Sequence, residues 1–239
     1  MKDVIDLHTH TIASGHAYST MNEMIHAAVD KGLEILGITE HAPALEESCR
    51  ENYFVNLKIL PRQRNGITVL YGAELNILDR DGHIDLPDTL LEKMDIVIAS
   101  IHGFCYPHNT DIVYNTDAYL NVMQKHRINL IGHPDDYPVD YKAIVECAKV
   151  CGTLLELNCT SLNPVHYRFQ NAEKNNRIML EYCSEMEVPI VISSDAHVDL
   201  AVADHGKGIA LLEEIGFPEH LIANANPEIL KNYLNYYKN

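Results

Sequence analysis

The chain has 239 residues, of which 46% are hydrophobic and 22% charged, so it has the composition of a globular protein and the length to bury a core. Its 18 basic and 34 acidic side chains leave a formal net charge of −16. This charge disfavours binding to long nucleic acids, because phosphate neutralisation needs clustered Lys and Arg. The count of 14 histidines is high, and histidine is the commonest metal ligand in proteins.

The expected compartment follows from the start of the chain and from its cysteines. The sequence opens on a strand-like run without a basic and apolar leader, and it has no apolar run of the roughly 18–20 residues that a membrane span needs. The six cysteines are scattered, several of them in apolar segments where a free thiol packs as a small hydrophobe. We therefore expect a cytoplasmic protein with reduced thiols and no membrane partner.

Short apolar runs alternate along the chain with longer amphipathic stretches. The runs predict seven strands, over residues 4–7, 35–38, 68–75, 96–101, 130–131, 154–157 and 189–192. Periodic apolar positions predict helices over residues 21–31, 116–127, 140–151, 171–186, 200–215 and 227–236. Repeated strand-then-helix units indicate an α/β fold with a parallel sheet, either a closed barrel or an open doubly wound sheet. No repeat or linker divides the sequence, so we expect one domain.

Two stretches depart from this alternation. Residues 42–66 predict an irregular link with a short helical piece between the second and third strands. Residues 78–84 carry an Asp-Gly turn between apolar residues, which predicts a β-hairpin. The same turn superficially resembles a calcium loop, but the required Gly and the terminal Glu are misplaced, so we expect no calcium there.

Candidate metal ligands follow the predicted strands at their carboxyl ends. The first strand ends in His8-Thr9-His10, and two imidazoles at this spacing point to one side of a strand, about 6.6 Å apart at the backbone. Any one such ending is explained by helix capping or local hydrogen bonds. So many imidazoles and carboxylates on one rim, however, would repel or stay unpaired without cations. The other strand-end candidates are His16, His41, Glu74, His102, His133, Asp195 and His197.

These strand endings also carry a family resemblance. The chain resembles the PHP (polymerase and histidinol phosphatase) superfamily in six motifs that occur in this order: His8-Thr9-His10, Glu40-His41, Gly72-Ala73-Glu74, Ser100-Ile101-His102, Gly132-His133-Pro134 and Ser194-Asp195-Ala196-His197. Residues 11–20 and Leu60-Pro61-Arg62 are most similar to its YcdX-type phosphatases. The resemblance implies a single PHP domain over residues 1–239, folded as a distorted (β/α)7 TIM-like barrel. It also implies a trinuclear metal centre, usually zinc, that hydrolyses phosphoesters.

The resemblance further implies which residues hold each ion. One metal takes His8, His10, Glu74 and Asp195; Glu74 bridges to a second, completed by His102 and His133; a third takes His16, His41 and His197. Asp135 departs from the pattern, because relatives often carry a small residue there, and this bears on substrate preference. We expect three divalent ions, zinc first, with manganese or iron as alternatives because such ligands accept all three.

The sequence therefore predicts a metal-dependent hydrolase of small phosphate monoesters, in which a metal-bound hydroxide attacks in line. In this prediction Glu74 and Asp195 are the catalytic carboxylates of the metal centre. Asp135 or Asp199 would protonate the leaving group, although ordinary helix capping explains both residues as well. Arg62 and Arg168 are candidate substrate-binding residues, because Arg matches phosphate bidentately, although an exposed Arg is more often only a surface charge.

Several alternatives stay open beside this prediction. Within the same superfamily they are a phosphodiesterase or exonuclease and a histidinol phosphatase. A metal-dependent amidohydrolase is disfavoured, because Glu74 occupies the bridging place and no Lys ends a middle strand. A non-catalytic metal-binding PHP module is disfavoured by the complete ligand set. The expected partner is a small phosphorylated substrate, and the sequence does not indicate an oligomeric state.

Overall fold

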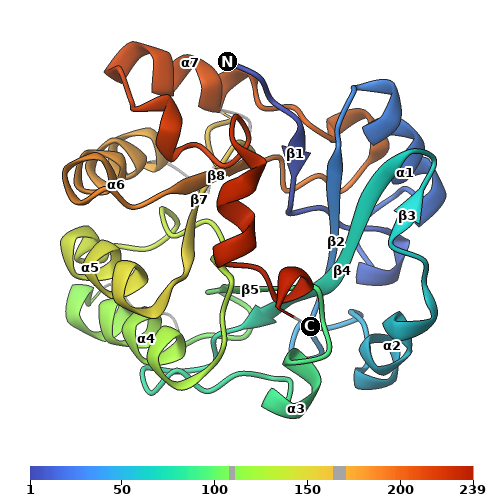
Figure 1. Cartoon of the computed structure of the whole chain (residues 1–239). Coiled ribbons are helices and arrows are strands. Elements are labelled where there is room, and N and C mark those ends of the chain that lie inside the picture. Colours follow the sequence, from blue (N-terminus) through green and yellow to red (C-terminus); the bar gives the residue numbers. More distant parts are fainter. Residues whose placement is uncertain (108–110, 164–170, 239) are drawn as a thin grey trace.

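A computed structural model of the chain describes residues 1–107, 111–163 and 171–238. Seven parallel strands of these residues form a nearly closed barrel with the helices outside it, which confirms the predicted (β/α)7 TIM-like fold (Figure 1). Their order around the barrel follows the chain: β1 (Ile5–Asp6), β2 (Ile35–His41), β4 (Ile67–Asn76), β5 (Ile96–Ser100), β6 (Leu130–Ile131), β7 (Leu154–Asn158) and β8 (Ile190–Ser193). A short strand, β3 (Gln63–Arg64), pairs antiparallel with the start of β4.

The helices follow the strands as the sequence patterns indicate. They are α1 (Met21–Asp30), α2 (Glu51–Asn56), α3 (Asp88–Leu91), α4 (Ile112–Lys125), α5 (Tyr141–Cys151), α6 (Ala172–Met186) and α7 (Gly206–Ile215). α1 begins at a capping box formed by Thr20 and Glu23. α4 begins four residues earlier than predicted, because the Asp111 side chain accepts hydrogen bonds from the backbone of Val113 and Tyr114.

Three predicted elements differ in the structure. Residues 78–84 form a turn with one isolated bridge between Ile77 and Ile84 rather than a hairpin with paired strands. The predicted helix over 200–215 begins only at Gly206, after a 3₁₀ turn η4 (Asp199–Ala201). The last predicted helix is instead two 3₁₀ turns, η6 (Pro227–Asn232) and η7 (Asn235–Tyr237). None of the helices in the described ranges combines the length and the apolar character that a bilayer crossing requires.

The C-terminal segment covers one end of the barrel. Figure 1 shows it lying across the barrel in front of the strands. Leu230 of η6 and Leu234 pack with the apolar residues Ile5, Ile35 and Ile96 in one buried cluster. Because these three residues begin their strands, the segment seals the amino-terminal end of the barrel. Only the opposite end of the barrel, where the strands have their carboxyl ends, is therefore open for functional side chains.

A buried polar cluster joins the first and last strands. Asp6 of β1 accepts hydrogen bonds from the backbone and the hydroxyl of Ser194, which follows β8, and from the backbone of Ala203. His205 Nδ1 lies 2.8 Å from an oxygen of Asp3, and its Nε2 lies 3.7 Å from Asp6 Oδ1. Burial opposes the charged form of His205, but Asp3 and Asp6 raise its pKa to about 10. The barrel therefore closes through a buried ionic contact.

This contact makes stability depend on pH. Because the pKa of His205 is raised on folding, its stabilisation is full below the unfolded value of about 6.5 and is lost as pH rises through about 10. We expect His205→Gln to lower the free energy of unfolding by about 3–5 kcal/mol at pH 6. Denaturant titrations of both proteins should show this difference shrinking towards pH 10.

The exposed His220 provides a control, since it has a single carboxylate partner, Glu187, at the surface. His220→Gln should change the free energy of unfolding by less than about 0.5 kcal/mol. A difference between the native protein and His205→Gln that stays constant from pH 6 to pH 10 would contradict the ionic role.

Candidate metal centre

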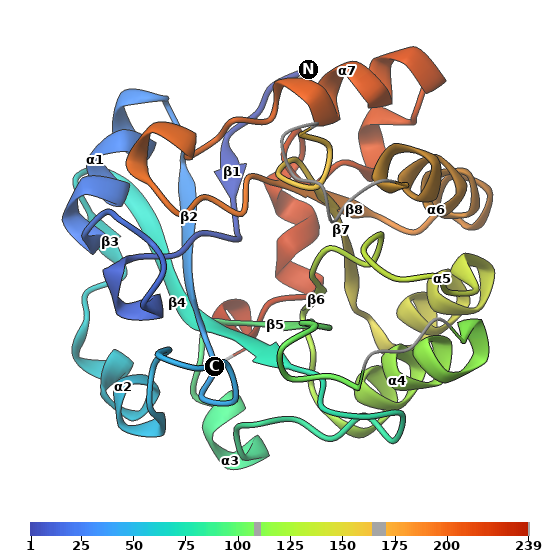
Figure 2. The same cartoon turned by 180° about the vertical axis from the view of Figure 1, so that it is seen from behind.

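The carboxyl-terminal ends of the strands bring the nine predicted ligands to one end of the barrel. This is the end turned towards the viewer in Figure 2, away from the C-terminal segment. His41 ends β2, and Glu74 lies two residues before the end of β4. The other ligands lie in the segments that follow strands: His8, His10 and His16 after β1, His102 after β5, His133 after β6, and Asp195 and His197 after β8.

Glu74 is fully buried at the centre of this cluster. One of its oxygens faces nitrogens of His8, His102 and His133, and the other faces those of His10 and His41, at 2.7–3.5 Å. Burial favours the protonated carboxyl, but His8, His102 and His41 hold the pKa of Glu74 well below its usual range. An ionised carboxylate whose two oxygens face different sets of imidazoles has the arrangement of a bridging ligand.

Asp195 is the second carboxylate of the cluster. Its Oδ1 lies 3.3 Å from His10 Nε2 and 3.6 Å from His8 Nε2. Although burial opposes ionisation, His8, His10 and His197 hold the pKa of Asp195 well below its usual range. The two carboxylates are therefore both ionised and both face the His8–His10 pair.

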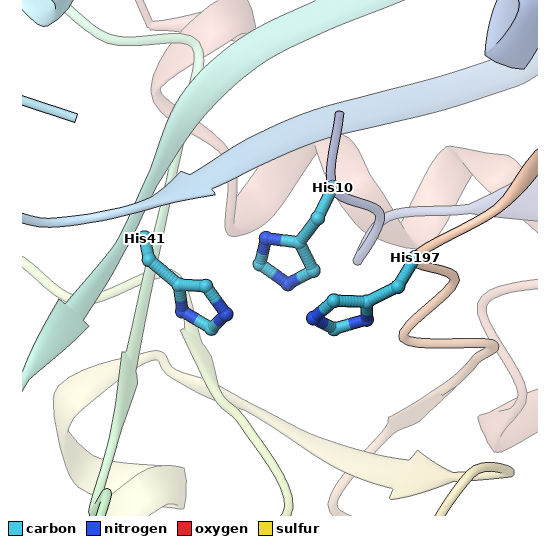
Figure 3. Close-up of side chains that lie close together, drawn as sticks. All are labelled: His10, His41 and His197. Atoms are coloured by element: carbon cyan, nitrogen blue, oxygen red, sulfur yellow. The ribbon is translucent and has the colours of Figure 1, made fainter. Parts of the chain in front are cut away.

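Figure 3 shows His10, His41 and His197 pointing their rings towards one space, although they come from three different parts of the barrel. One ring nitrogen of each lies within 4.8 Å of the others. His16 extends this group, since its Nε2 lies 3.0 Å from Nε2 of His197. Two further groups satisfy the same limit at this end of the barrel: His8, His10 and Glu74, and His41, Glu74 and His102. His41 thus belongs to two groups, whereas the family pattern assigns it only to the site with His16 and His197.

The cluster has the chemistry of a divalent metal site. Nε2 of His8, His10 and His41 is buried without a hydrogen-bond partner, and so is Oε2 of Glu74. An unsatisfied buried polar atom costs about 1–3 kcal/mol, and cations bound in the ligand groups would satisfy these atoms. Burial together with His41 and His197 holds the pKa of His10 well below its usual value, and burial lowers the pKa of His41 to about 4. These rings are neutral at pH 7, as metal ligands must be, and nitrogen and carboxylate donors suit zinc.

A second layer of buried residues holds the imidazoles in place. The carboxylate of Glu156 in β7 accepts a hydrogen bond from His8 Nδ1 at 2.9 Å and another from the backbone N–H of His133 at 2.7 Å. Asn76 Oδ1 lies 2.8 Å from Nδ1 of His102. Such partners fix which ring nitrogen faces the metal. Sequence reasoning missed Glu156, although a lone acidic residue inside the apolar run 154–157 was a usable signal.

Two of the ligand residues have unusual backbone angles. The φ of His133 is 28° and that of Asp195 is 53°, in the left-handed region that side chains other than Gly rarely adopt. Gly132 is also constrained, because a Cβ there would lie 2.3 Å from the hydroxyl oxygen of Ser100. Strained backbone of this kind persists where the surrounding structure holds it, and it gathers at functional sites.

The predicted substrate and proton-transfer residues lie differently from the ligands. Arg62 bonds Asp95 and the carbonyls of Leu57 and Leu60 at the amino-terminal end of β4 and β5, the end opposite the predicted ligands. Asp135 is buried outside the lining of the cleft described below, where burial and Asp136 raise the pKa of its carboxyl.

Two more of these predictions concern surface segments. Asp199 accepts a hydrogen bond from Ser19 Oγ, and its own backbone N–H donates to that hydroxyl, so it ties η4 to the loop before α1. Arg168 lies outside the described residues.

The ligands open onto a cleft of about 1100 Å³. Six of them line it, together with residues of the loops that follow β2, β5, β7 and β8. The six are His16, His41, His102, His133, Asp195 and His197. This volume slightly exceeds the roughly 300–1,000 Å³ typical of small-molecule sites, so an organic molecule has room beside the cluster.

Glu156 offers a direct test of the second layer. In Glu156→Gln an amide replaces the carboxylate that orients His8, and we expect zinc affinity to fall by about 10–100-fold while the fold is kept. Competition with a chromophoric chelator would measure this affinity. Glu146→Gln on the exposed face of α5 is the matched control. Equal affinities in the two variants would show that Glu156 does not position His8.

Known proteins with similar sequences and structures identify the family of this chain. The sequence pattern of the PHP domain family matches residues 6–237. A probable phosphatase of Caldanaerobacter subterraneus is 41% identical over 233 residues, covering 97% of this chain and 91% of that protein. A probable phosphatase of Clostridium novyi is 39% identical over 236 residues, covering 98% and 95%. The fold is shared with a histidinol phosphate phosphatase of Lactococcus lactis that was crystallised with zinc, L-histidinol and phosphate. The TM-score is 0.61 and the identity 19%, and the match covers 90% of this chain and 95% of that one. The chain therefore belongs to the PHP domain family.

Proposed function

We propose that this protein is a metal-dependent phosphatase that hydrolyses small phosphate monoesters at a centre of three divalent ions. The observation that carries the proposal is the buried Glu74 carboxylate among five imidazoles beside an open cleft. The names of the relatives support it, since proteins 39–41% identical over nearly the whole chain are called probable phosphatases. The neighbour crystallised with zinc and phosphate supports the same chemistry.

The ligand groups suggest how three ions would be held. His8, His10, Glu74 and Asp195 would hold one, Glu74 with His102 and His133 a second, and His16, His41 and His197 a third. Zinc is the expected ion, with manganese or iron as alternatives. Such ions supply an activated water near neutral pH and stabilise charge on phosphoryl oxygens.

The chain's own residues prepare the site for a phosphate dianion. With neutral imidazoles, three divalent ions and the two ionised carboxylates would leave a local charge of about +4. This field attracts an anion even though the whole chain carries −16. Burial keeps water from screening it, because His8, His10 and Glu74 have no exposed surface.

Substitution of the central ligands tests the proposal. We expect Glu74→Gln and His102→Ala to lower the turnover of p-nitrophenyl phosphate by about 10²–10⁴-fold and to lower the metal content, because each removes a ligand of the cluster. Circular dichroism should show that both variants stay folded. His220→Ala, which changes an exposed imidazole far from the cluster, should keep the turnover of the native protein. Near-normal turnover in a folded Glu74→Gln variant would overturn the proposal.

Metal removal tests the cofactor. Elemental mass spectrometry on protein purified without chelator should find about three equivalents of zinc, manganese or iron per chain. Dialysis against a chelator should abolish hydrolysis, and stepwise addition of zinc should restore it. Full activity in metal-free protein would contradict the proposal.

The same experiment separates the alternative functions. Protein that regains its metal but hydrolyses no ester would favour a non-catalytic module. Faster cleavage of bis-(p-nitrophenyl) phosphate than of the monoester would favour a phosphodiesterase.

A further inference from the structure

The cleft has a second wall that the metal ligands do not explain. Beyond the ligands it is lined by five apolar residues, two glutamates and one threonine. They come from the loops after β2, β5, β7 and β8: Ala44, Leu45, Glu46, Glu47, Phe104, Thr160, Val198 and Ala201. We call this set the distal wall. An alcohol group esterified to a phosphate at the cluster would lie against it.

The apolar part of the distal wall is available for contact. Phe104 is 89% exposed, which is unusual for a residue that normally supplies a large buried area. It stands at the cleft together with the half-buried Val198 and with Leu45, which is only 9% exposed, and both come from loops on other strands. An exposed aromatic ring at the rim of a cleft with other apolar residues marks a surface that binds an apolar group.

The acidic part of the distal wall is held rigidly. The loop of Glu46 and Glu47 is tied down by Ser48 Oγ, which donates to the Ala42 carbonyl at 2.8 Å, and by the Ala44 N–H, which donates to Asp85 at 2.8 Å. Glu47 has a φ of 64°, a strained conformation for a residue with a side chain. Its carbonyl packs against Gly15, where a Cβ would lie only 2.5 Å from it. The loop backbone therefore holds Glu46 and Glu47 at the cleft, with their side chains exposed.

No Lys or Arg balances these carboxylates among the lining residues that the structure describes. The hydroxyl of Thr160 is also engaged, since it donates to the Ser194 carbonyl at 2.8 Å. The distal wall therefore offers apolar surface and negative charge, but no described cationic partner for an anion. A second phosphate or a carboxylate placed there would be repelled, because like charges at short range disfavour binding.

Resting on the proposed phosphatase activity, we propose that the substrate is a phosphate monoester whose alcohol part presents an apolar face to Phe104, Leu45 and Val198 and carries no second anionic group. Phe104 is then a specificity-determining residue that binds the alcohol part. Glu46 and Glu47 are specificity-determining residues that exclude esters with another negative charge.

The test measures two ratios between esters and asks which variants of the distal wall change them, because a variant leaves the intrinsic reactivity of each ester unchanged. With the zinc-loaded enzyme, 4-ethylphenyl phosphate and 4-(carboxymethyl)phenyl phosphate differ mainly in the added carboxylate, and glycerol 1-phosphate lacks the apolar face. We expect kcat/KM to favour the ethyl ester about tenfold over the carboxymethyl ester and more than tenfold over glycerol 1-phosphate. The double variant Glu46→Gln/Glu47→Gln should reduce the first ratio about tenfold, and Phe104→Ala should reduce the second about tenfold.

Two matched controls lie on α5, outside the cleft. Val150 is 86% exposed, so Val150→Ala removes an apolar side chain as exposed as Phe104, and Glu146→Gln removes an exposed carboxylate. Both controls should leave the two ratios unchanged. Hydrolysis of all three esters with ratios that neither test variant alters would overturn this inference alone. Failure of the metal-loaded enzyme to hydrolyse any of them would overturn the proposed function and this inference together.

Discussion

The structure depends on one buried carboxylate. Glu74 has no exposed surface, and its charge persists only because imidazoles from five different positions face it. A charge in this environment costs several kcal/mol unless it is fully compensated. The parallel strands supply that compensation, because their carboxyl ends converge at one edge. Glu156 and Asn76 are needed for the same reason, because they keep the imidazoles from rotating. An imidazole that rotated away would leave the buried charge of Glu74 without a partner.

The acidity of the chain and the charge of the site have opposite signs, and the barrel keeps them apart. Most of the acidic side chains behind the net charge of −16 lie at the surface, whereas most of the ligands are buried at one end. His10 and His41 are neutral and add no positive charge of their own, so the field around them depends on the ions that they would hold. With such ions bound, the cluster would attract a small anion despite the net charge of the chain.

The periodicity of the sequence predicted a parallel sheet with the ligands gathered at one edge, and the resemblance to the PHP superfamily implied that the sheet closes into a barrel. Each ligand motif follows an apolar run, and parallel strands bring such positions together whatever the loops do. Phosphate binding by Arg62 was predicted from its residue type, and the structure places Arg62 at the end of the barrel opposite the ligands. Its place before the strand 68–75, which puts it at the amino-terminal end of the barrel, was the better guide. Glu156 was overlooked because it lies within an apolar run. The C-terminal 3₁₀ turns were predicted as one helix because the spacing of Leu230 and Leu234 fits an α-helix as well as these turns.

The seam between β1 and β8 has a consequence for how the chain folds. Four of the ligands stand on the two sides of this seam, His8 and His10 near the start of the chain and Asp195 and His197 near its end. Ions bound between them would act as a cross-link that closes a loop running from residue 10 to residue 195, and long loops carry the largest closure entropy. Metal binding would then oppose unfolding at the junction with the highest contact order, where the two ends of the chain must find each other last.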